Sequence, residues 1–222
     1  MDQDRTILKL EDVEYKNPTG TVIFNKISFS LERGRTAVII GPTGAGKTTL
    51  VELIIGSKSP AAGEICLFGQ RLNKCGKGRI FKLRRLIGGV GGIFQLIESR
   101  TVTENILLPL IIRGEKSSLQ YKKAARVMGQ LGLTGWQNEP AWALSQGQKN
   151  MVMLARAVVA DQPLLLIDEP LAGLDKDTAQ HVNKTLQSFA IGGHSMLIMT
   201  SGQTGLFIPE AREYYLSEGG LK

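Results

Sequence analysis

The sequence predicts an α/β fold with a mixed or parallel sheet at its core. Two short apolar runs, 164–168 and 195–200, have the length and composition of strands buried on both faces of a parallel sheet. A helical pattern at 176–190 separates them, and the order strand, helix, strand indicates a βαβ unit. Alternating residues over 6–40 add an antiparallel β lobe, and helical spacing dominates the middle of the chain.

Regular elements follow one another along the chain. Turn signals at 17–18 (Asn-Pro) and 33–34 (Arg-Gly) separate the first alternating segments. A helix is expected from Gly46 to about Ile55, and others where apolar residues return at helical spacing. The other expected strands are 7–15, 22–31, 36–40, 63–69 and 213–216, and the other expected helices are 79–87, 103–112, 118–131 and 146–160.

Length and composition predict a single domain over 1–222. The chain has 222 residues, 42% of them hydrophobic, which is enough to bury one substantial core. It has no run of 18 uncharged apolar residues, and its start is too polar for a signal peptide. We therefore expect a soluble, unprocessed protein that needs a separate chain for any membrane role. Cys66 and Cys75 lack metal-ligand spacing and are expected to be free thiols in a reducing cytoplasm.

The net charge of +7 favours acidic partners such as nucleotide phosphates or anionic lipid surfaces. Basic residues concentrate at 71–85 (RLNKCGKGRIFKLRR), and the simpler interpretation of this run is a solvated helix or loop face. It carries no nucleic-acid reader motif and no interleaved aromatic residues. We therefore expect no nucleic-acid partner.

A phosphate-binding loop is predicted at 41–49, because 41–48 fits G-x-x-x-x-G-K-[ST] between an apolar strand and a helix. The glycines let backbone N–H groups point at phosphate oxygens, and the helix N-terminus adds a positive dipole end. Lys47 supplies charge for the outer phosphates, and the Thr48 hydroxyl is a ligand for Mg²⁺. A chance glycine-rich turn is disfavoured by this context. The predicted loop residues are Gly41, Pro42, Thr43, Gly44, Ala45, Gly46, Lys47, Thr48 and Thr49.

Two acidic residues, Asp168 and Glu169, follow four apolar residues at the end of a predicted strand. A carboxylate at the C-terminal end of a parallel strand lies at the ligand crevice of the sheet. Asp168 is therefore expected to hold Mg²⁺, usually through water, and Glu169 to act as general base on the attacking water. The alternative, two acids that merely end a strand, is disfavoured by the phosphate-binding loop.

With these motifs the sequence resembles the ABC ATPases over nearly its whole length. The segment 144–148 (LSQGQ) resembles the family signature LSGGQ and precedes Asp168 as the signature does in the family. Ser145 and Gln148 also form an S-x-x-Q capping box for the following helix. The resemblance implies that Ser145, Gly147 and the helix dipole face the γ-phosphate bound by the other subunit of a dimer.

Three further positions match the family in order. Gln95, in GGIFQ, matches the glutamine that is implied to reach the Mg²⁺ and water and to sense the membrane partner. Asp175, in AGLD, matches the loop that crosses the dimer interface. Tyr15 is the candidate for stacking on adenine, with an ordinary strand tyrosine as the alternative. The implied cofactors are ATP and Mg²⁺.

The resemblance also implies a subdivision of the chain. Residues 1–95 and 160–222, approximately, form the catalytic core with its antiparallel β lobe. Residues 96–159, approximately, form a helical subdomain that carries the signature.

Segment 81–114 most resembles the group that contains FtsE, LolD and MacB, and FtsE is nearest through LPLIIRG at 108–114. This resemblance implies an ATP-bound homodimer beneath a separate integral membrane protein of the FtsX or MacB type, at the inner face of the cell membrane. Cell division, export or mechanotransmission would be the task. We expect the docking groove around 96–114, although its apolar cluster is more simply core. Two extra residues within 87–94 predict a flexible glycine-rich segment, GGVGG.

The sequence departs from the family pattern at two positions. Ser201 stands where the family has a histidine that contacts the γ-phosphate, and neither His181 nor His194 follows that strand. Both histidines are expected to be ordinary surface residues. A serine cannot supply the charge of an imidazole, so slow turnover is expected. Gln146 replaces the first signature glycine, and its side chain either crowds the facing nucleotide or lies outward.

Two other functions compete with a membrane-coupled ATPase. One is an ATP-dependent clamp or scaffold with weak hydrolysis, which the missing histidine favours and Glu169 opposes. The other is an ABC protein acting on DNA or the ribosome. Such proteins usually carry two cassettes or a long coiled-coil insertion, and this chain has neither.

Overall fold

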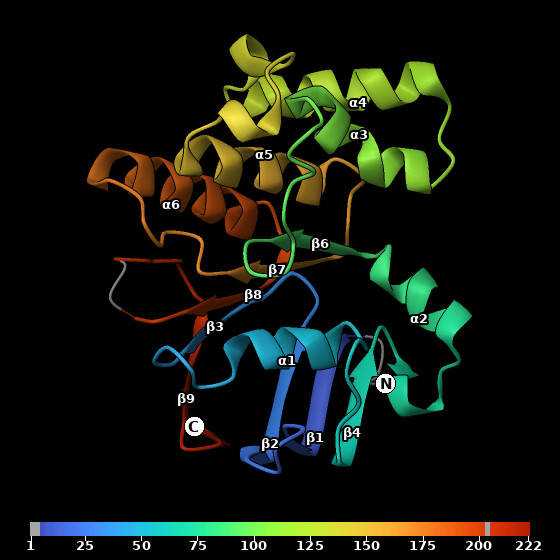
Figure 1. Ribbon diagram of the computed structural model, residues 1–222, viewed down its shortest axis with the longest axis vertical. Coiled ribbons are helices and arrows are strands. Elements are labelled where there is room, and N and C mark those ends of the chain that lie inside the picture. Colours follow the sequence, from blue (N-terminus) through green and yellow to red (C-terminus); the bar gives the residue numbers. More distant parts are fainter. Residues whose placement is uncertain (1–4, 203–204) are drawn as a thin grey trace.

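A computed structural model of the chain, which describes residues 5–202 and 205–222, contains two β-sheets and six α-helices (Figure 1). The first sheet has four antiparallel strands in the order β2-β1-β4-β5. The second has six strands in the order β10-β9-β3-β8-β7-β6. The strands are β1 (Thr6–Lys16), β2 (Val22–Glu32), β3 (Thr36–Ile40), β4 (Ala62–Leu67), β5 (Gln70–Arg71), β6 (Ile87–Val90), β7 (Leu164–Asp168), β8 (Ser195–Thr200), β9 (Arg212–Ser217) and β10 (Gly220–Leu221).

The six-stranded sheet is parallel except at one edge, where β10 runs antiparallel to β9. Every residue of β7 and β8 is buried, as the apolar runs predict. Alternate side chains face opposite sides of the sheet. Leu165 and Ile167 join the hydrophobic cluster that contains α5, whereas Leu164 and Leu166 join the cluster that contains α1 and the first sheet. The prediction of an antiparallel lobe beside a mixed sheet is confirmed.

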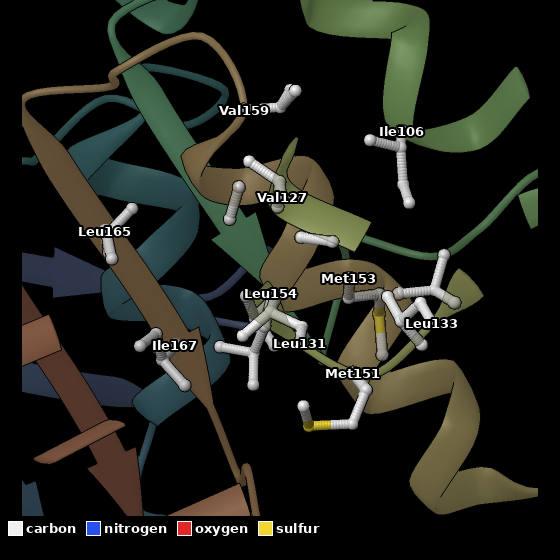
Figure 2. Packing of buried hydrophobic residues seen from close by; sticks show 14 of the residues in the cluster. Ile106, Val127, Leu131, Leu133, Met151, Met153, Leu154, Val159, Leu165 and Ile167 are labelled. Carbon is white, nitrogen blue, oxygen red and sulfur yellow. The ribbon is translucent and has the colours of Figure 1, made fainter. Parts of the chain in front are cut away.

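Helices cover both faces of this sheet. Figure 1 shows α1 beside the antiparallel sheet and α3, α4 and α5 gathered at the opposite end of the molecule. Figure 2 shows Leu154 beside Ile167 of β7, with Val127 and Ile106 farther from this strand in the same cluster of buried side chains. The helices are α1 (Lys47–Ile54), α2 (Lys77–Arg84), α3 (Val102–Ile112), α4 (Ser117–Gln130), α5 (Gln146–Val158) and α6 (Lys176–Ile191), with 3₁₀ turns at Leu72–Lys74, Thr134–Trp136 and Ala141–Ala143.

The prediction for segment 79–94 is wrong in two respects. The helix ends at Arg84, and Ile87 begins strand β6, which pairs in parallel with β7. The segment GGVGG is therefore not a flexible loop throughout, since its first three residues, 88–90, lie in strand β6. A Cβ at Gly88 would collide with the carbonyl oxygen of Ala157 in α5. The glycine is needed for close packing between α5 and the edge of the sheet.

The remaining predicted elements occur within a few residues of their expected bounds. The short strands β5 and β10 were not predicted, because each has only two residues. Cys66 and Cys75 are unpaired, as expected. None of the helices formed by residues 5–202 and 205–222 is long and apolar enough to cross a membrane. The division into a catalytic core and a helical subdomain stays a prediction.

Candidate functional site

The loop between β3 and α1 is fixed at both ends. Gly41 N–H donates to the Thr200 carbonyl of β8 (3.0 Å), which holds the start of the loop on the sheet. Gly46 caps α1 with φ of 101°, and a Cβ there would lie 2.7 Å from Ile23 Cγ2. Both the backbone conformation and the crowding require glycine at this position. The next residue, Lys47, is the first of the helix.

The Lys47 side chain is only 7% exposed. Its ammonium donates to the carbonyl oxygens of Gly41 (2.7 Å) and Pro42 (3.2 Å), and its Nζ lies 3.2 Å from Glu169 Oε1. A buried ammonium is tolerated only when such partners surround it. The loop therefore holds this positive charge at its own centre.

Asp168 is the last residue of β7 and is 5% exposed. Thr48 Oγ1 donates to its Oδ2 at 3.4 Å, which joins the first turn of α1 to the end of the strand. Burial and then the charge of Glu169 raise the pKa of Asp168, while Thr48 and Lys47 act against this rise. Two neighbouring acids thus meet a hydroxyl and an ammonium.

Glu169 follows in a left-handed conformation (φ 49°), and its carboxylate lies against Lys47 of the loop. Its amide donates to the Met199 carbonyl (2.9 Å), which fixes the backbone on β8. The Ser201 N–H donates to Glu169 Oε2 (3.1 Å), while Lys47 holds Oε1. Both carboxylate oxygens are therefore placed by other groups of the site.

These residues surround one cavity of about 480 Å³, which we call the phosphate cavity after the predicted phosphate-binding loop that lines it. The structure thus brings together six of the nine predicted loop residues, both predicted acids and Ser201, whereas Gly41, Pro42 and Ala45 do not line the cavity. Ala172 also lines the cavity and was not predicted, because nothing in its residue type marks it. The lining residues are Thr43, Gly44, Gly46, Lys47, Thr48, Thr49, Asp168, Glu169, Ala172 and Ser201.

The oxygen donors of this cavity fit Mg²⁺. Thr48 and Asp168 present a hydroxyl and a carboxylate 3.4 Å apart, and hard oxygen ligands are those that Mg²⁺ prefers. Within residues 5–202 and 205–222 no group of three or more His, Cys, Asp or Glu side chains could hold a metal alone. This donor set suits an ion that also takes oxygen ligands from phosphates and water.

The predicted capping box at the start of α5 is confirmed. Gln148 N–H donates to Ser145 Oγ (3.3 Å), and Ser145 N–H donates to Gln148 Oε1 (2.8 Å). The Gln146 side chain donates to Asn150 Oδ1 (3.0 Å) along its own helix. A Cβ at Gly147 would collide with Thr178 of α6, so this glycine lets the two helices approach. These signature residues do not line the phosphate cavity of their own chain.

Asp175 caps α6. Its Oδ1 accepts from the backbone N–H groups of Asp177 (3.1 Å) and Thr178 (3.0 Å). Hydrogen bonding from the Thr178 side chain, and then from its backbone N–H, lowers the pKa of Asp175, while burial acts against this change. Like Ser145, this residue lies outside the phosphate cavity.

Gln95 also lies outside this cavity, and its side chain donates to the carbonyl of Gly92 in its own loop. Arg156 of α5 donates to the carbonyl oxygens of Phe94 (2.7 Å) and Gln95 (2.8 Å), so it holds this loop against α5. Burial lowers the pKa of Arg156. The sequence did not identify this arginine, because its role depends on a contact between distant segments.

The two glycines shortly before Gln95 bring its loop into close contact with Asp168. A Cβ at Gly91 would collide with the carbonyl oxygen of Asp168, and one at Gly92 would collide with Oδ2 of the same residue. Two consecutive glycines directly before I-F-Q are a sequence signal for this close approach.

A second cavity, of about 530 Å³, lies beside Gln95 between the β6 region and α3. Leu108, Pro109 and Ile112 line it from within the segment expected to form a docking groove. Other apolar residues of that segment, such as Val102 and Ile106, are buried in the core instead. The other lining residues are Phe81, Arg84, Arg85, Ile87, Gly88, Gly89, Ile93, Phe94, Arg156, Ala157 and Gln162.

Three further residues considered in the sequence analysis also lie away from both cavities. Tyr15 is 9% exposed and packs in the hydrophobic cluster of the first sheet, with Lys58 Nζ 5.6 Å from its ring centroid. His181 is exposed on α6, as expected. His194 is half-buried rather than an ordinary surface residue, because its ring packs against Phe189 at 5.3 Å between centroids.

The sequence matches known proteins over most of its length. Residues 24–172 match the family profile described as ABC transporter. The chain is 32% identical over 188 residues to the ABC transporter ATP-binding protein YxdL of Bacillus subtilis, covering 84% of this chain and 73% of that protein. It is 30% identical over 207 residues to the lipoprotein-releasing system ATP-binding protein LolD of Chromohalobacter salexigens, covering 93% and 87%.

Solved structures share the fold. A dimeric bacterial ABC transporter cassette superposes with a TM-score of 0.87 at 27% identity, covering 97% of this chain and 96% of that one. The same cassette as a dimer in a post-hydrolysis state, bound to ADP and Pi, gives a TM-score of 0.86 at 26% identity, with the same coverage.

Proposed function

This chain belongs to the ABC transporter family of ATP-binding subunits, and we propose that it hydrolyses ATP as a homodimer and thereby drives a separate membrane protein. One observation carries the proposal. Two segments that are far apart in the sequence meet in one cavity. The end of the phosphate-binding loop contributes Lys47 and Thr48, and the end of β7 contributes Asp168 and Glu169. The arrangement supplies a cation for phosphates, oxygen ligands for Mg²⁺ and a carboxylate beside both.

Each residue has a chemical task in this proposal. The backbone N–H groups of the loop and the Lys47 ammonium bind the β- and γ-phosphates of ATP. Thr48 and Asp168 would hold a Mg²⁺ ion, Asp168 usually through water, and the ion would supply positive charge to the phosphate oxygens. Glu169 accepts a proton from the attacking water, and its two placed oxygens limit where that water can lie.

The dimer completes the site. Ser145 and Asp175 lie outside the cavity of their own chain, at the N-termini of α5 and α6. In a dimer each helix end can face the nucleotide of the other subunit, where its dipole and hydroxyl stabilise the γ-phosphate. The dimeric form of the similar cassette supports this arrangement. Gln95 would reach the Mg²⁺ after its side chain leaves the Gly92 carbonyl.

The groove beside Gln95 is the proposed dock for the membrane partner. Its apolar lining includes Leu108, Pro109 and Ile112. Arg156 also lines the groove and donates a hydrogen bond to the Gln95 carbonyl. The likeness to LolD supports a partner of the FtsX or MacB type at the inner face of the cell membrane. The nearer likeness to FtsE, and with it cell division, stays a prediction.

Adenine recognition by Tyr15 also stays a prediction. Its ring is packed in the core, so stacking on adenine requires an edge of the ring or a rearrangement of the strand end.

Dimerisation tests the proposal directly. We expect ATP to convert purified Glu169→Gln protein from monomer to dimer in analytical ultracentrifugation, because ATP persists when its hydrolysis is blocked. Ser145→Arg, added to this variant, should abolish the dimer and leave ATP binding intact. Ser117→Arg, at the exposed start of α4, is the matched control. A dimer that forms equally with and without ATP, or that still forms in the Ser145→Arg variant, would refute a nucleotide site shared between two subunits.

A further inference from the structure

The helix α2, the turn before it and the residue after it form a basic surface, and all but one of its charged side chains lie outside the two cavities described above. We define the basic surface as five exposed side chains, Lys74, Lys77, Arg79, Lys82 and Arg85. The sequence contains no acidic residue between Glu64 and Glu98, so no negative charge is interleaved with them. Such a charge run differs from the mixed charges of an ordinary solvated helix.

Within the part of the chain that the structure describes, none of the five forms an ion pair. The neighbouring Arg71 does, since its Nε lies 3.0 Å from Glu64 Oε2. The charge of the basic surface is therefore not neutralised by the fold. The five charges create a positive surface potential that favours the binding of an external anion.

An exposed aromatic ring lies among these charges. Phe81 of α2 is 59% exposed, and the Arg84 guanidinium lies 5.3 Å from its ring centroid. The opposite side of the helix is anchored, because Leu83 is buried and Ile80 packs against Gly56. Arg84 Nε also donates to the Ile55 carbonyl (2.7 Å). The helix is thus held with its phenylalanine and its lysines outward.

The basic surface borders the groove beside Gln95. Phe81 and Arg85 line this groove together with Ile112 at the end of α3, and Ile112 is itself exposed. Figure 1 shows α2 and the C-terminal end of α3 along the same edge of the molecule. If the groove receives a membrane protein, this edge faces the bilayer. That placement rests on the proposed function, whereas the charge and exposure do not.

We propose that the basic surface, with Phe81 at its centre, binds the headgroups of anionic phospholipids directly. Lysine and arginine side chains close to a bilayer are attracted by its negative surface potential, and an aromatic ring at the interface adds apolar burial. The same charges could attract a nucleic acid, but the surface offers one aromatic side chain and no reader motif. Lipid is therefore the occupant that the composition favours.

Vesicle flotation of the purified full-length chain, without any membrane partner, tests this inference. We expect the protein to float with vesicles of phosphatidylcholine and phosphatidylglycerol, and not with phosphatidylcholine alone. Binding should weaken as salt rises. The triple variant K77Q/R79Q/K82Q should bind on the order of 100-fold more weakly, about fivefold for each charge removed. Phe81→Ser should weaken binding even at high salt.

The matched control is K26Q/R126Q/K184Q, which removes the same charge from exposed positions on β2, α4 and α6. It should float like the wild type. Equal binding by the two triple variants, equal binding to both vesicle types, or no binding at all would overturn the proposal. So would tighter binding of duplex DNA or RNA that K77Q/R79Q/K82Q abolishes. ATP-dependent dimerisation should persist in K77Q/R79Q/K82Q, so loss of flotation alone leaves the proposed function untouched.

Discussion

Lys47 and Glu169 form an ion pair across the candidate site, with Nζ 3.2 Å from Oε1. The same ammonium is the group expected to bind the outer phosphates, and the same carboxylate is the expected general base. A phosphate group that binds the Lys47 ammonium therefore competes with the Glu169 carboxylate for the same positive charge. The competition would release Oε1 for a water molecule, while the Ser201 N–H keeps Oε2 in place.

Glu169→Gln should lower the rate of ATP hydrolysis by roughly 10²- to 10⁴-fold, because an amide cannot accept the proton of the attacking water. Steady-state phosphate release measures the effect. Glu52→Gln, which removes a carboxylate paired with Lys58 at the surface, is the control and should leave the rate unchanged. Equal rates for wild type and Glu169→Gln would instead favour the ATP-dependent clamp.

Ser201→His should raise kcat by about tenfold or more, because an imidazole can stabilise charge on the transferring phosphoryl group. Ser201→Ala should leave kcat unchanged, since residue 201 contacts Glu169 through its backbone N–H. Both variants are compared in ATPase assays on the dimer. A wild-type rate that already equals that of Ser201→His would contradict the expectation of slow turnover.

Gly88→Ala should lower the free energy of unfolding by about 1–3 kcal/mol, because the new methyl group collides with the backbone of α5. Gly78→Ala is the control on α2, where a Cβ meets nothing within 4 Å. It should raise stability by up to about 1 kcal/mol, through helix propensity. Urea unfolding followed by circular dichroism measures both changes. Equal stability of the two variants would contradict the packing explanation for β6.

His194 should make the free energy of unfolding fall as the pH drops below about 6.5. Burial lowers the pKa of this imidazole below its ordinary value of 6.5, although Asp161 acts against the change. As pH falls, the unfolded chain therefore takes up the proton before the folded chain does, and stability present above pH 6.5 is lost. Urea midpoints of wild type and His194→Gln should converge at low pH. The exposed His181→Gln serves as control, and an equal slope in all three proteins would refute the assignment.

The sequence predicts best where a function depends on neighbours in the chain. The phosphate-binding loop needs glycines, Lys47 and Thr48 within a few residues, so its pattern is visible without a fold. The same holds for the capping box of Ser145 and Gln148, whose hydrogen bonds span three residues. The buried strands β7 and β8 are marked by their continuous apolar runs.

Contacts between distant segments were not predictable in this way. Strand β6 lacks an apolar run because α5 leaves room only for Gly88 on one face. Arg156 resembles any helix arginine until the fold places it behind Phe94 and Gln95. The contact of Ser201 with Glu169 uses a backbone N–H, which residue type cannot reveal. Tertiary packing decided each of these.

Helix α5 links two parts of the candidate site, because Ser145 caps one end and Arg156 near the other end binds the loop at Gln95. Ser145 caps its first turn, and near its last turn Arg156 grips the backbone at Gln95. Eleven residues separate the two, or roughly 16 Å of helix, so a tilt of about ten degrees displaces one end by roughly 3 Å relative to the other. A movement of Ser145 at the proposed dimer interface would therefore also move the backbone at Gln95 beside the groove, because α5 carries contacts to both.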